Sequence, residues 1–424
     1  MSDSPLTLVL DTEDWNVSNL SECSLFIKDG THGTHKRTPT GIPLLSAKNV
    51  TASGKIKWDV NDSLVSEADY SKIHSKYELE KDDLLLTVVG TLGRRALVDG
   101  SAKFTIQRSV GVIRPDKNKV TPNFIFHFCG SDFFQNQLEL RANATAQAGV
   151  YLGELAKVPV PSPPLPEQKK IAAILTSVDE VIEKTQAKID KLKDLKTGMM
   201  QELLTCGVGV DGKPHTEFKD SPVGRVPKGW EVVELDRAAK VIDCKHATPK
   251  YFSNGFPVVK PGNIREGFLE LRGCSLTDKA GFDNLNENHT PTIGDIIYSR
   301  NQTYGVGAYV NRSMEFCIGQ DVCVISPKKC NSIFLFYMIN SPLVKEQVEL
   351  LAAGSTFKRI NLGSIRKLKI ALPCIEEQQA IGAVFESIDN KVSLLEKKLI
   401  KKKDTKKALM QDLLTGKKRV KVDS

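Results

Sequence analysis

The chain has 424 residues, of which 40% are hydrophobic and 26% charged, so it is too long for one ordinary core and too apolar to be disordered. Its 59 lysines and arginines outnumber 51 aspartates and glutamates, and the net charge of +8 favours an anionic partner without requiring one. The nine cysteines form no C-x-x-C pair and show no spacing typical of a tetrahedral zinc site. We therefore expect reduced thiols, no disulfides and no structural metal.

Hydropathy gives no sign of a membrane segment. Met1–Pro5 lack the basic flank and apolar stretch of a signal peptide, and apolar runs such as Leu84–Val89 are far too short to cross a bilayer. The expected location is the cytoplasm, with no membrane partner.

Residues 1–162 are expected to form a first globular domain, in which one polar loop has side chains suited to DNA. This loop, Asp29–Arg37, reads D-G-T-H-G-T-H-K-R between two apolar runs. Specific readout needs donors and acceptors at base edges, and cations that hold phosphates. The alternative for Asp29 and His32 is a turn held by internal side-chain hydrogen bonds. The candidate contacts in this domain are Thr31, His32, Thr34, Lys36, Arg37, Arg94 and Arg95.

Residues 163–206 have the apolar spacing of a long amphipathic helix. From Ile171 the seam positions advance by alternating steps of four and three residues, which is typical of a coiled coil. Pro164 and Pro166 suit its first turn, and Gly207 suits the residue at which a helix ends. The seam consists of Ile171, Leu175, Val178, Ile182, Thr185, Ile189, Leu192, Lys196, Met199 and Leu203.

After a Gly- and Pro-rich linker at 207–229, residues 230–372 repeat the first domain. The matches have slightly different offsets, as loops of unequal length would require. They pair Asp29–Thr34 with Asp243–Thr248, Gly41–Leu45 with Gly255–Val259, Asp83–Leu86 with Asp295–Tyr298, and Val150–Gly153 with Ile360–Gly363.

The second domain offers its own candidate contacts with DNA. The repeated loop, Asp243–Tyr251, reads D-C-K-H-A-T-P-K-Y, and again a self-contained turn is the alternative for Asp243 and His246. Asn and Gln can bind adenine through two hydrogen bonds, and Arg can do so with guanine. For these polar side chains, and for two cations before the second helix, a solvated surface is the alternative. The candidates are Lys245, His246, Thr248, Lys250, Tyr251, Arg300, Asn301, Gln302, Lys358 and Arg359.

Residues 373–424 repeat the long helix and add a basic tail. Glu167-Gln168 recurs as Glu377-Gln378 and Met200–Thr205 as Met410–Thr415, both 210 positions later, so the two helical segments have equal length. The second copy keeps the seam, with two interruptions at Lys402 and Lys406. Its lysine-rich run, Lys397–Lys407, could follow DNA or meet a protein partner, and a solvated helix face is the alternative.

A helix with a single apolar stripe needs a partner, and the duplication supplies one of matched length. We therefore predict an α+β protein in which two similar globular domains are separated by a pair of long antiparallel coiled-coil helices, related by a pseudo-two-fold internal repeat. The roughly 33 residues from Ile171 to Leu203 would span about 50 Å, close to one and a half turns of B-DNA. Such a pair could act as a ruler between two DNA half-sites.

These residues resemble the conserved regions of Type I restriction-modification specificity subunits. In that family, Glu-Gln after proline, a spaced Ile-Asp and M-Q-x-L-L-T-G close each half of the protein. Here the middle element is Val178-Asp179 and Ile388-Asp389. The resemblance covers essentially the whole chain, with two departures: Glu376 where the first copy has Pro166, and Cys206 where glycine is expected.

The resemblance implies a division of labour. Each target-recognition domain would read one half of a bipartite double-stranded DNA site, and the helices would dock two methyltransferase subunits. Those subunits bind S-adenosylmethionine and methylate adenine, while separate restriction and translocase subunits use ATP to move and cut DNA. This chain would direct these activities without catalysing them.

The sequence has no motif for chemistry of its own. It contains no N-P-P-Y/F or D-P-P-Y/F methyltransferase motif, no G-x-x-x-x-G-K-S/T and no G-x-G-x-x-G, so we expect no catalytic residue and no cofactor. Two alternatives to a DNA-binding subunit stay open: a divergent DNA-modifying enzyme, which would bind S-adenosylmethionine by itself, and a duplicated coiled-coil adaptor, which would lack salt-sensitive DNA affinity.

Overall fold

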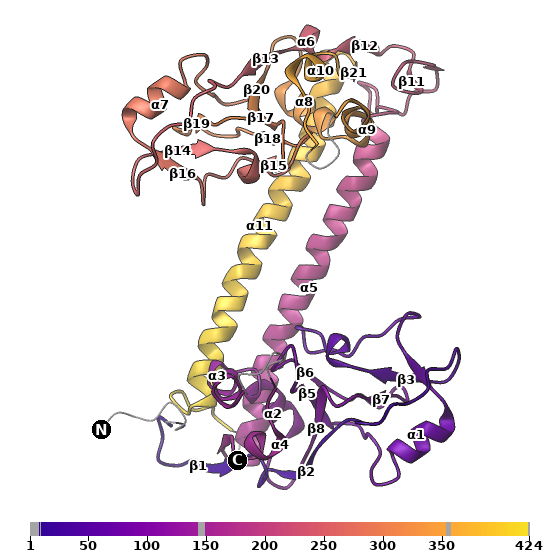
Figure 1. The fold of residues 1–424 in the computed structure, drawn as a ribbon, viewed down its shortest axis with the longest axis vertical. Coiled ribbons are helices and arrows are strands. Elements are labelled where there is room, and N and C mark those ends of the chain that lie inside the picture. The colour runs from indigo at the N-terminus through magenta and orange to yellow at the C-terminus, as the bar shows by residue number, and fades with distance from the viewer. Residues whose placement is uncertain (1–7, 9, 143–148, 353–357, 423–424) are drawn as a thin grey trace. The chain divides into compact units, whose positions relative to one another are not determined.

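The computed structural model describes residues 8, 10–142, 149–352 and 358–422, so Met1–Pro5 lie outside the described residues. It divides into two compact units, residues 1–185 with 398–424 and residues 186–397. Both are α+β, and Figure 1 shows their elements. No helix of the described chain combines the length and apolarity needed to span a bilayer.

The first unit contains a four-stranded antiparallel sheet in the order β2-β8-β5-β6, a three-stranded sheet in the order β4-β3-β7, and the pair β1-β9. At the middle of the larger sheet, the apolar run Leu84–Leu86 is fully buried, as expected for a strand covered on both faces. The strands are β1 (Asn16–Asn19), β2 (Ser24–Asp29), β3 (Ile42–Leu45), β4 (Leu64–Val65), β5 (Leu84–Thr87), β6 (Arg95–Leu97), β7 (Thr105–Ile106), β8 (Val110–Pro115) and β9 (Pro159–Ser162). The short helices are η1 (Ala47–Asn49), α1 (Glu67–Ile73), α2 (Pro122–Phe128), α3 (Asp132–Arg141) and α4 (Leu152–Leu155).

The second unit repeats this plan, with sheets in the order β13-β20-β17-β18-β15 and β16-β14-β19, and the pair β12-β21. It adds the edge strand β15, helix α6 and, in the linker, the hairpin β10-β11. Its strands are β10 (Phe218–Lys219), β11 (Val226–Pro227), β12 (Glu231–Glu234), β13 (Ala239–Asp243), β14 (Phe256–Val259), β15 (Gly267–Phe268), β16 (Ser275–Thr277), β17 (Ile296–Ser299), β18 (Gly307–Tyr309), β19 (Cys317–Ile318), β20 (Val322–Pro327) and β21 (Lys369–Leu372). The short helices are α6 (Leu235–Ala238), η2 (Pro261–Asn263), α7 (Lys279–Leu285), α8 (Ser332–Ile339), α9 (Pro342–Leu351) and α10 (Leu362–Arg366).

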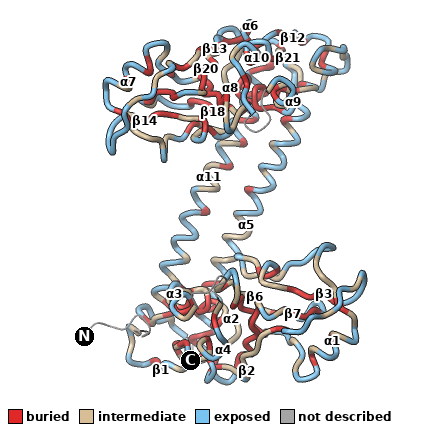
Figure 2. The backbone as a smooth tube through the Cα atoms, in the orientation of Figure 1, coloured by how far each residue is buried: buried red, intermediate tan, exposed pale blue. Residues whose placement is uncertain are grey.

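The two long helices are α5 (Leu165–Leu203) and α11 (Ile375–Leu414), and each begins in one unit and ends in the other. In the first unit, Met410 and Leu413 of α11 share a buried core with Leu175 of α5. In the second unit, Met200 of α5 shares a core with Phe385 of α11. The start of one helix thus packs with the end of the other in both units, which confirms the antiparallel pairing. Figure 2 shows burial concentrated in the sheets and at these helix ends.

Two of the three lysines in the predicted seam have specific partners. Lys196 Nζ lies 2.9 Å from Asp389 Oδ2 in the second unit, and Lys406 Nζ lies 2.6 Å from Asp179 Oδ1 in the first. These are the same contact made twice, because Asp179 and Asp389, like Lys196 and Lys406, are 210 positions apart. Lys402, in contrast, is exposed. Lys196 and Lys406 therefore join the helices rather than interrupt the seam.

A third group meets each of these aspartates from a globular part. The Tyr337 hydroxyl donates to Asp389 Oδ2 at 2.7 Å. His127 Nδ1 lies 3.8 Å from Asp179 Oδ2, and burial lowers the pKa of His127 to about 3, so this imidazole is neutral. Tyr337 thus joins Asp389 to the globular core by a hydrogen bond, whereas the neutral His127 imidazole lies near Asp179 without a hydrogen bond to it.

The glutamate of each Glu-Gln pair is buried, and its carboxylate accepts several hydrogen bonds. Glu377 accepts hydrogen bonds from the backbone of Val208 and Gly209 and from Trp230 Nε1, at 3.0 to 3.1 Å, and His215 Nε2 lies 2.9 Å from it. Glu377 therefore ties the start of α11 to the chain that leaves α5.

In the first unit, Glu167 does the same for the other helix. It accepts from Trp15 Nε1 at 3.2 Å and from the Arg419 guanidinium at 2.7 and 2.9 Å. The start of α5 is thereby joined to the chain that leaves α11.

Replacing Glu377 with glutamine should lower the free energy of unfolding by about 2 kcal/mol, because an amide presents N–H groups to donors that need an acceptor. Calorimetric melting of the purified chain measures this. Glu376→Gln is the matched control, since Glu376 is exposed next to it, and equal melting of the two variants would contradict this role for Glu377.

Lys196→Met should cost about 2 kcal/mol, because it leaves the Asp389 carboxylate, whose side chain is 18% exposed, without its cation. Lys193→Met breaks another ion pair between the same helices, with Glu396 at 2.7 Å, but these side chains are 56% and 46% exposed and the cost should stay below about 1 kcal/mol. Chemical denaturation of both variants gives the comparison, and a larger loss in Lys193→Met would overturn it.

Candidate DNA-recognition surfaces

The predicted loop of the first domain begins at the last residue of β2. The Asp29 carboxylate contacts His32 Nε2, and Thr31 Oγ1 lies 2.6 Å from His35 Nε2, so these side chains hold the turn together. The turn-building alternative for Asp29 and His32 thus has the contacts it requires. Thr34, Lys36 and Arg37 are exposed at its end.

The two cations of this loop differ in how they are held. Arg37 Nη1 donates to the carbonyl of His35 at 3.1 Å, which directs the side chain along the loop. Among the described residues, Lys36 has no ion pair. Both charges are exposed to solvent and able to meet phosphates.

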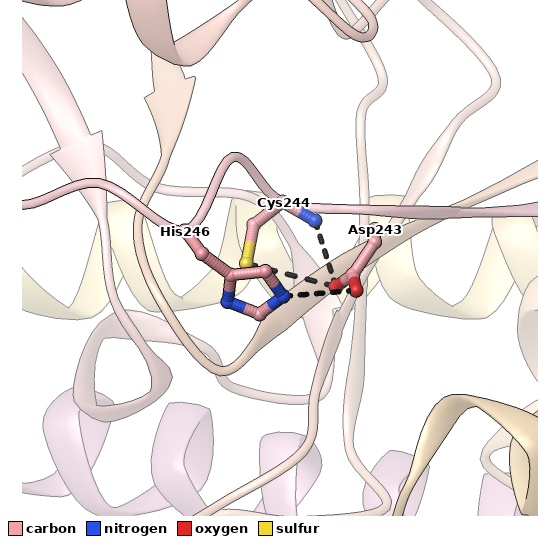
Figure 3. A group of neighbouring side chains, drawn as sticks. All are labelled: Asp243, Cys244 and His246. Carbon is pink, nitrogen blue, oxygen red and sulfur yellow. Dashed lines mark hydrogen bonds and ion pairs between the residues drawn. The ribbon is translucent and has the colours of Figure 1, made fainter.

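The repeated loop of the second domain is built in the same way, from the last residue of β13. His246 Nε2 lies 3.2 Å from Asp243 Oδ2, as Figure 3 shows. Lys245 forms an ion pair with Glu287, whereas Lys250 is exposed and has no ion pair among the described residues. Of the two lysines, Lys250 is the one whose charge is uncompensated.

Asp243, Cys244 and His246 also lie close enough together to hold a metal ion, a grouping that the sequence analysis missed. Three observations speak for a structural role. Arg300 Nη1 already occupies the Asp243 carboxylate at 2.7 Å, burial raises the pKa of the Cys244 thiol, and the first domain keeps the Asp-His contact with Gly30 in place of the cysteine. A cation here would face a guanidinium and a protonated thiol.

The structure brings together two candidate loops that are far apart in the sequence. Thr248 and Tyr251 of the first loop, and Asn301 and Gln302 of the second, line one depression of about 520 Å³ in the second domain. Gln302 adopts a left-handed backbone conformation with φ 56°, and the residue is exposed. The depression thus combines a hydroxyl, a phenol and two amides on one surface.

Other residues of this depression were not predicted from the sequence. Lys260, which follows β14, places Nζ 4.0 Å from the centre of the Tyr251 ring. Gln320, which follows β19, donates to Thr248 Oγ1 at 3.1 Å. A polar residue within two positions of the end of a strand of the smaller sheet is the signal that could have identified both.

Two predicted arginines differ from expectation because their guanidiniums are used inside the fold. Arg300 is 5% exposed and links Asp243 to the region of Ile360, whose carbonyl lies 3.5 Å from Nε. Arg95 Nε donates to the Phe126 carbonyl at 2.6 Å, its guanidinium stacks on the Phe126 ring, and burial lowers its pKa. In both arginines the fold thus uses part of the guanidinium's set of N–H donors.

The side chains of three further candidates contact other residues of the fold but are not fully buried. Arg94 Nη1 reaches the Val50 carbonyl at 3.5 Å. Lys358 pairs with Glu349 at 2.8 Å, and Arg359 pairs with Asp321 at 2.7 Å, each lysine or arginine side chain being nearly half exposed. Asp321 also lines the depression, so Arg359 contacts one of its lining residues.

Comparisons with known proteins agree with this architecture. The family model for the Type I restriction modification DNA specificity domain matches residues 13–194 and 227–402. The chain is 29% identical to a Methanocaldococcus jannaschii protein named as the MjaX specificity subunit of a type I restriction enzyme, over 96% of this chain and 95% of that one. It is 21% identical to the EcoKI specificity subunit of Escherichia coli K12, over 91% and 84%.

Among solved structures, the S subunit of a Type I restriction-modification system from M. genitalium has the same fold, with a TM-score of 0.62 at 15% identity, covering 97% of this chain and 98% of that one. The duplicated domains, the paired helices and the two matched segments lead to one conclusion: this chain belongs to the Type I restriction-modification DNA specificity family.

Proposed function

We propose that each globular domain reads one half of a bipartite double-stranded DNA site for a Type I restriction-modification complex. The observation that carries this proposal is the repeated loop after β2 and β13. The Asp-His contact builds the same turn in both domains, while the exposed side chains on it differ. Two domains that share a turn but carry different exposed side chains on it are suited to contact two different DNA sequences.

The chemistry of the second domain suits base edges. Amides of Asn301 and Gln302 can pair with adenine, and the Thr248 hydroxyl can donate or accept at either base of a pair. In the first domain, the cations Lys36 and Arg37 suit phosphates.

We further propose that α5 and α11 dock two methyltransferase subunits, which supply S-adenosylmethionine chemistry, and that restriction subunits join through them. The repeat supports two copies of the methyltransferase subunit, because the Lys-Asp contact between the helices occurs twice. Such a complex would act in the cytoplasm, where its DNA is. No observation favours the enzyme or the adaptor alternative.

Co-expression with the neighbouring methyltransferase gene, followed by genome-wide detection of modified adenine, tests the proposal. The expected result is one asymmetric site with two defined halves and an unspecified spacer. Methylation at a single undivided site would contradict it.

Replacing Lys36 and Arg37 with alanine should weaken DNA binding by the methyltransferase complex without changing the preferred sequence. If both contact phosphates, the slope of log affinity against log salt should become shallower by about 2. Lys228→Ala with Arg225→Ala removes the same charges from the linker and is the matched control. Equal slopes in the two variants would count against the loop.

Gln302→Ala should relax the preference at one position in only one half of the site, by about tenfold, because one bidentate base contact is lost. Sequencing of methylated sites from the variant complex shows this directly. An unchanged pattern, or loss spread evenly over both halves, would exclude Gln302 as a base contact.

A further inference from the structure

The two domains share a turn that lies outside the predicted DNA-contact loops. It joins β7 to β8 in the first domain and β19 to β20 in the second. β7 and β19 begin at Thr105 and Cys317, and the strands that follow, β8 and β20, begin at Val110 and Val322. Both pairs are 212 positions apart, so the two turns between them have equal length. Arg108 in the first domain therefore occupies the position of Gln320 in the second.

Both residues lie against the recognition loop of their own domain. The Arg108 backbone N–H donates to the Thr31 carbonyl at 3.1 Å, next to the bridge between Thr31 and Gln107. Gln320 Nε2 donates to Thr248 Oγ1 at 3.1 Å. The repeat thus places one long polar side chain beside each loop, by a different contact in each domain.

Arg108 differs from the other arginines of its domain because its guanidinium has no bonding partner among the described residues. It is exposed, and within residues 8–162, as far as the structure describes them, it is the one arginine whose side chain makes no hydrogen bond or ion pair. The other arginines of this range contact a backbone or side-chain oxygen; they are Arg37, Arg94, Arg95, Arg114 and Arg141. Its five N–H donors are therefore all available.

Gln320 keeps enough of its amide free to bind a base. It is exposed and lines the depression with Asn301 and Gln302. Thr248 takes one of its two N–H groups, so the second N–H and the oxygen Oε1 are left over. One donor and one acceptor side by side are what the N7 and N6 atoms of adenine require.

We propose that Arg108 and Gln320 are equivalent specificity-determining residues, Arg108 binding guanine and Gln320 binding adenine at one position of each half-site. The chemistry assigns the bases, because a guanidinium matches the O6 and N7 acceptors of guanine and a carboxamide matches adenine. This inference rests on the proposed function, since it assumes that each domain reads its own half-site.

The test uses the complete methyltransferase complex and sequencing of its methylated sites. Arg108→Gln should lower the preference for guanine at one position by about tenfold and favour adenine there, leaving the other half-site unchanged. Gln320→Ala should relax one position in the opposite half only. Duplexes with that single base pair exchanged should show the same change in affinity.

Two further variants separate base reading from other roles. Arg108→Lys keeps the charge but loses the planar fork, so it should also lose guanine selectivity; if it behaves as wild type while Arg108→Gln binds all sequences more weakly, Arg108 contacts phosphate and the proposal is wrong. Arg225→Gln, in the linker, should leave the methylated site unchanged.

The melting temperatures of all variants should match wild type, since neither side chain is buried. A folded Arg108→Gln complex with an unaltered site overturns the proposal. A wild-type complex whose site has no two halves would instead overturn the proposed function, so the two failures are distinguishable.

Discussion

A buried carboxylate at the start of each long helix is the constraint on which the architecture depends. A carboxylate without partners would be costly to bury, so Glu167 and Glu377 require the donors that surround them. Those donors come from a tryptophan of the adjoining domain and from the chain that leaves the other helix. Each unit therefore needs the beginning of one helix and the end of the other, and antiparallel pairing follows.

The seam shows what a repeated pattern can and cannot predict. The shared offset of 210 predicted two helices of equal length, because that argument depends only on order along the chain, and the matched apolar stripes predicted that they pair. Periodicity could not show that Lys196 and Lys406 face aspartates, since the partner of a side chain depends on packing. Strand β15, helix α6 and the hairpin β10-β11 have no counterpart among the residues of the first half that the structure describes, and they left no repeat signal.

For the candidate site as well, some features could be predicted from the sequence and others could not. The loops after β2 and β13 could be identified because they are polar runs between apolar ones. The association of the loop after β13 with Asn301 and Gln320 could not, because these residues follow separate strands that only the folded sheets bring together. Arg95 and Arg300 illustrate the reverse: a guanidinium looks the same in sequence whether it faces solvent or, as here, an internal carbonyl or carboxylate.

The strand pairs β1-β9 and β12-β21 affect how this protein can change during evolution. Each joins the first and last strands of a globular domain, with Asn16 opposite Ser162 and Glu231 opposite Leu372. The chain thus enters and leaves each domain at neighbouring points. A genetic exchange with both boundaries in these strands would replace a whole domain and leave the helices, the ion pairs between the two helices and the other half intact. Such an exchange would therefore change the sequence of one globular domain at a time.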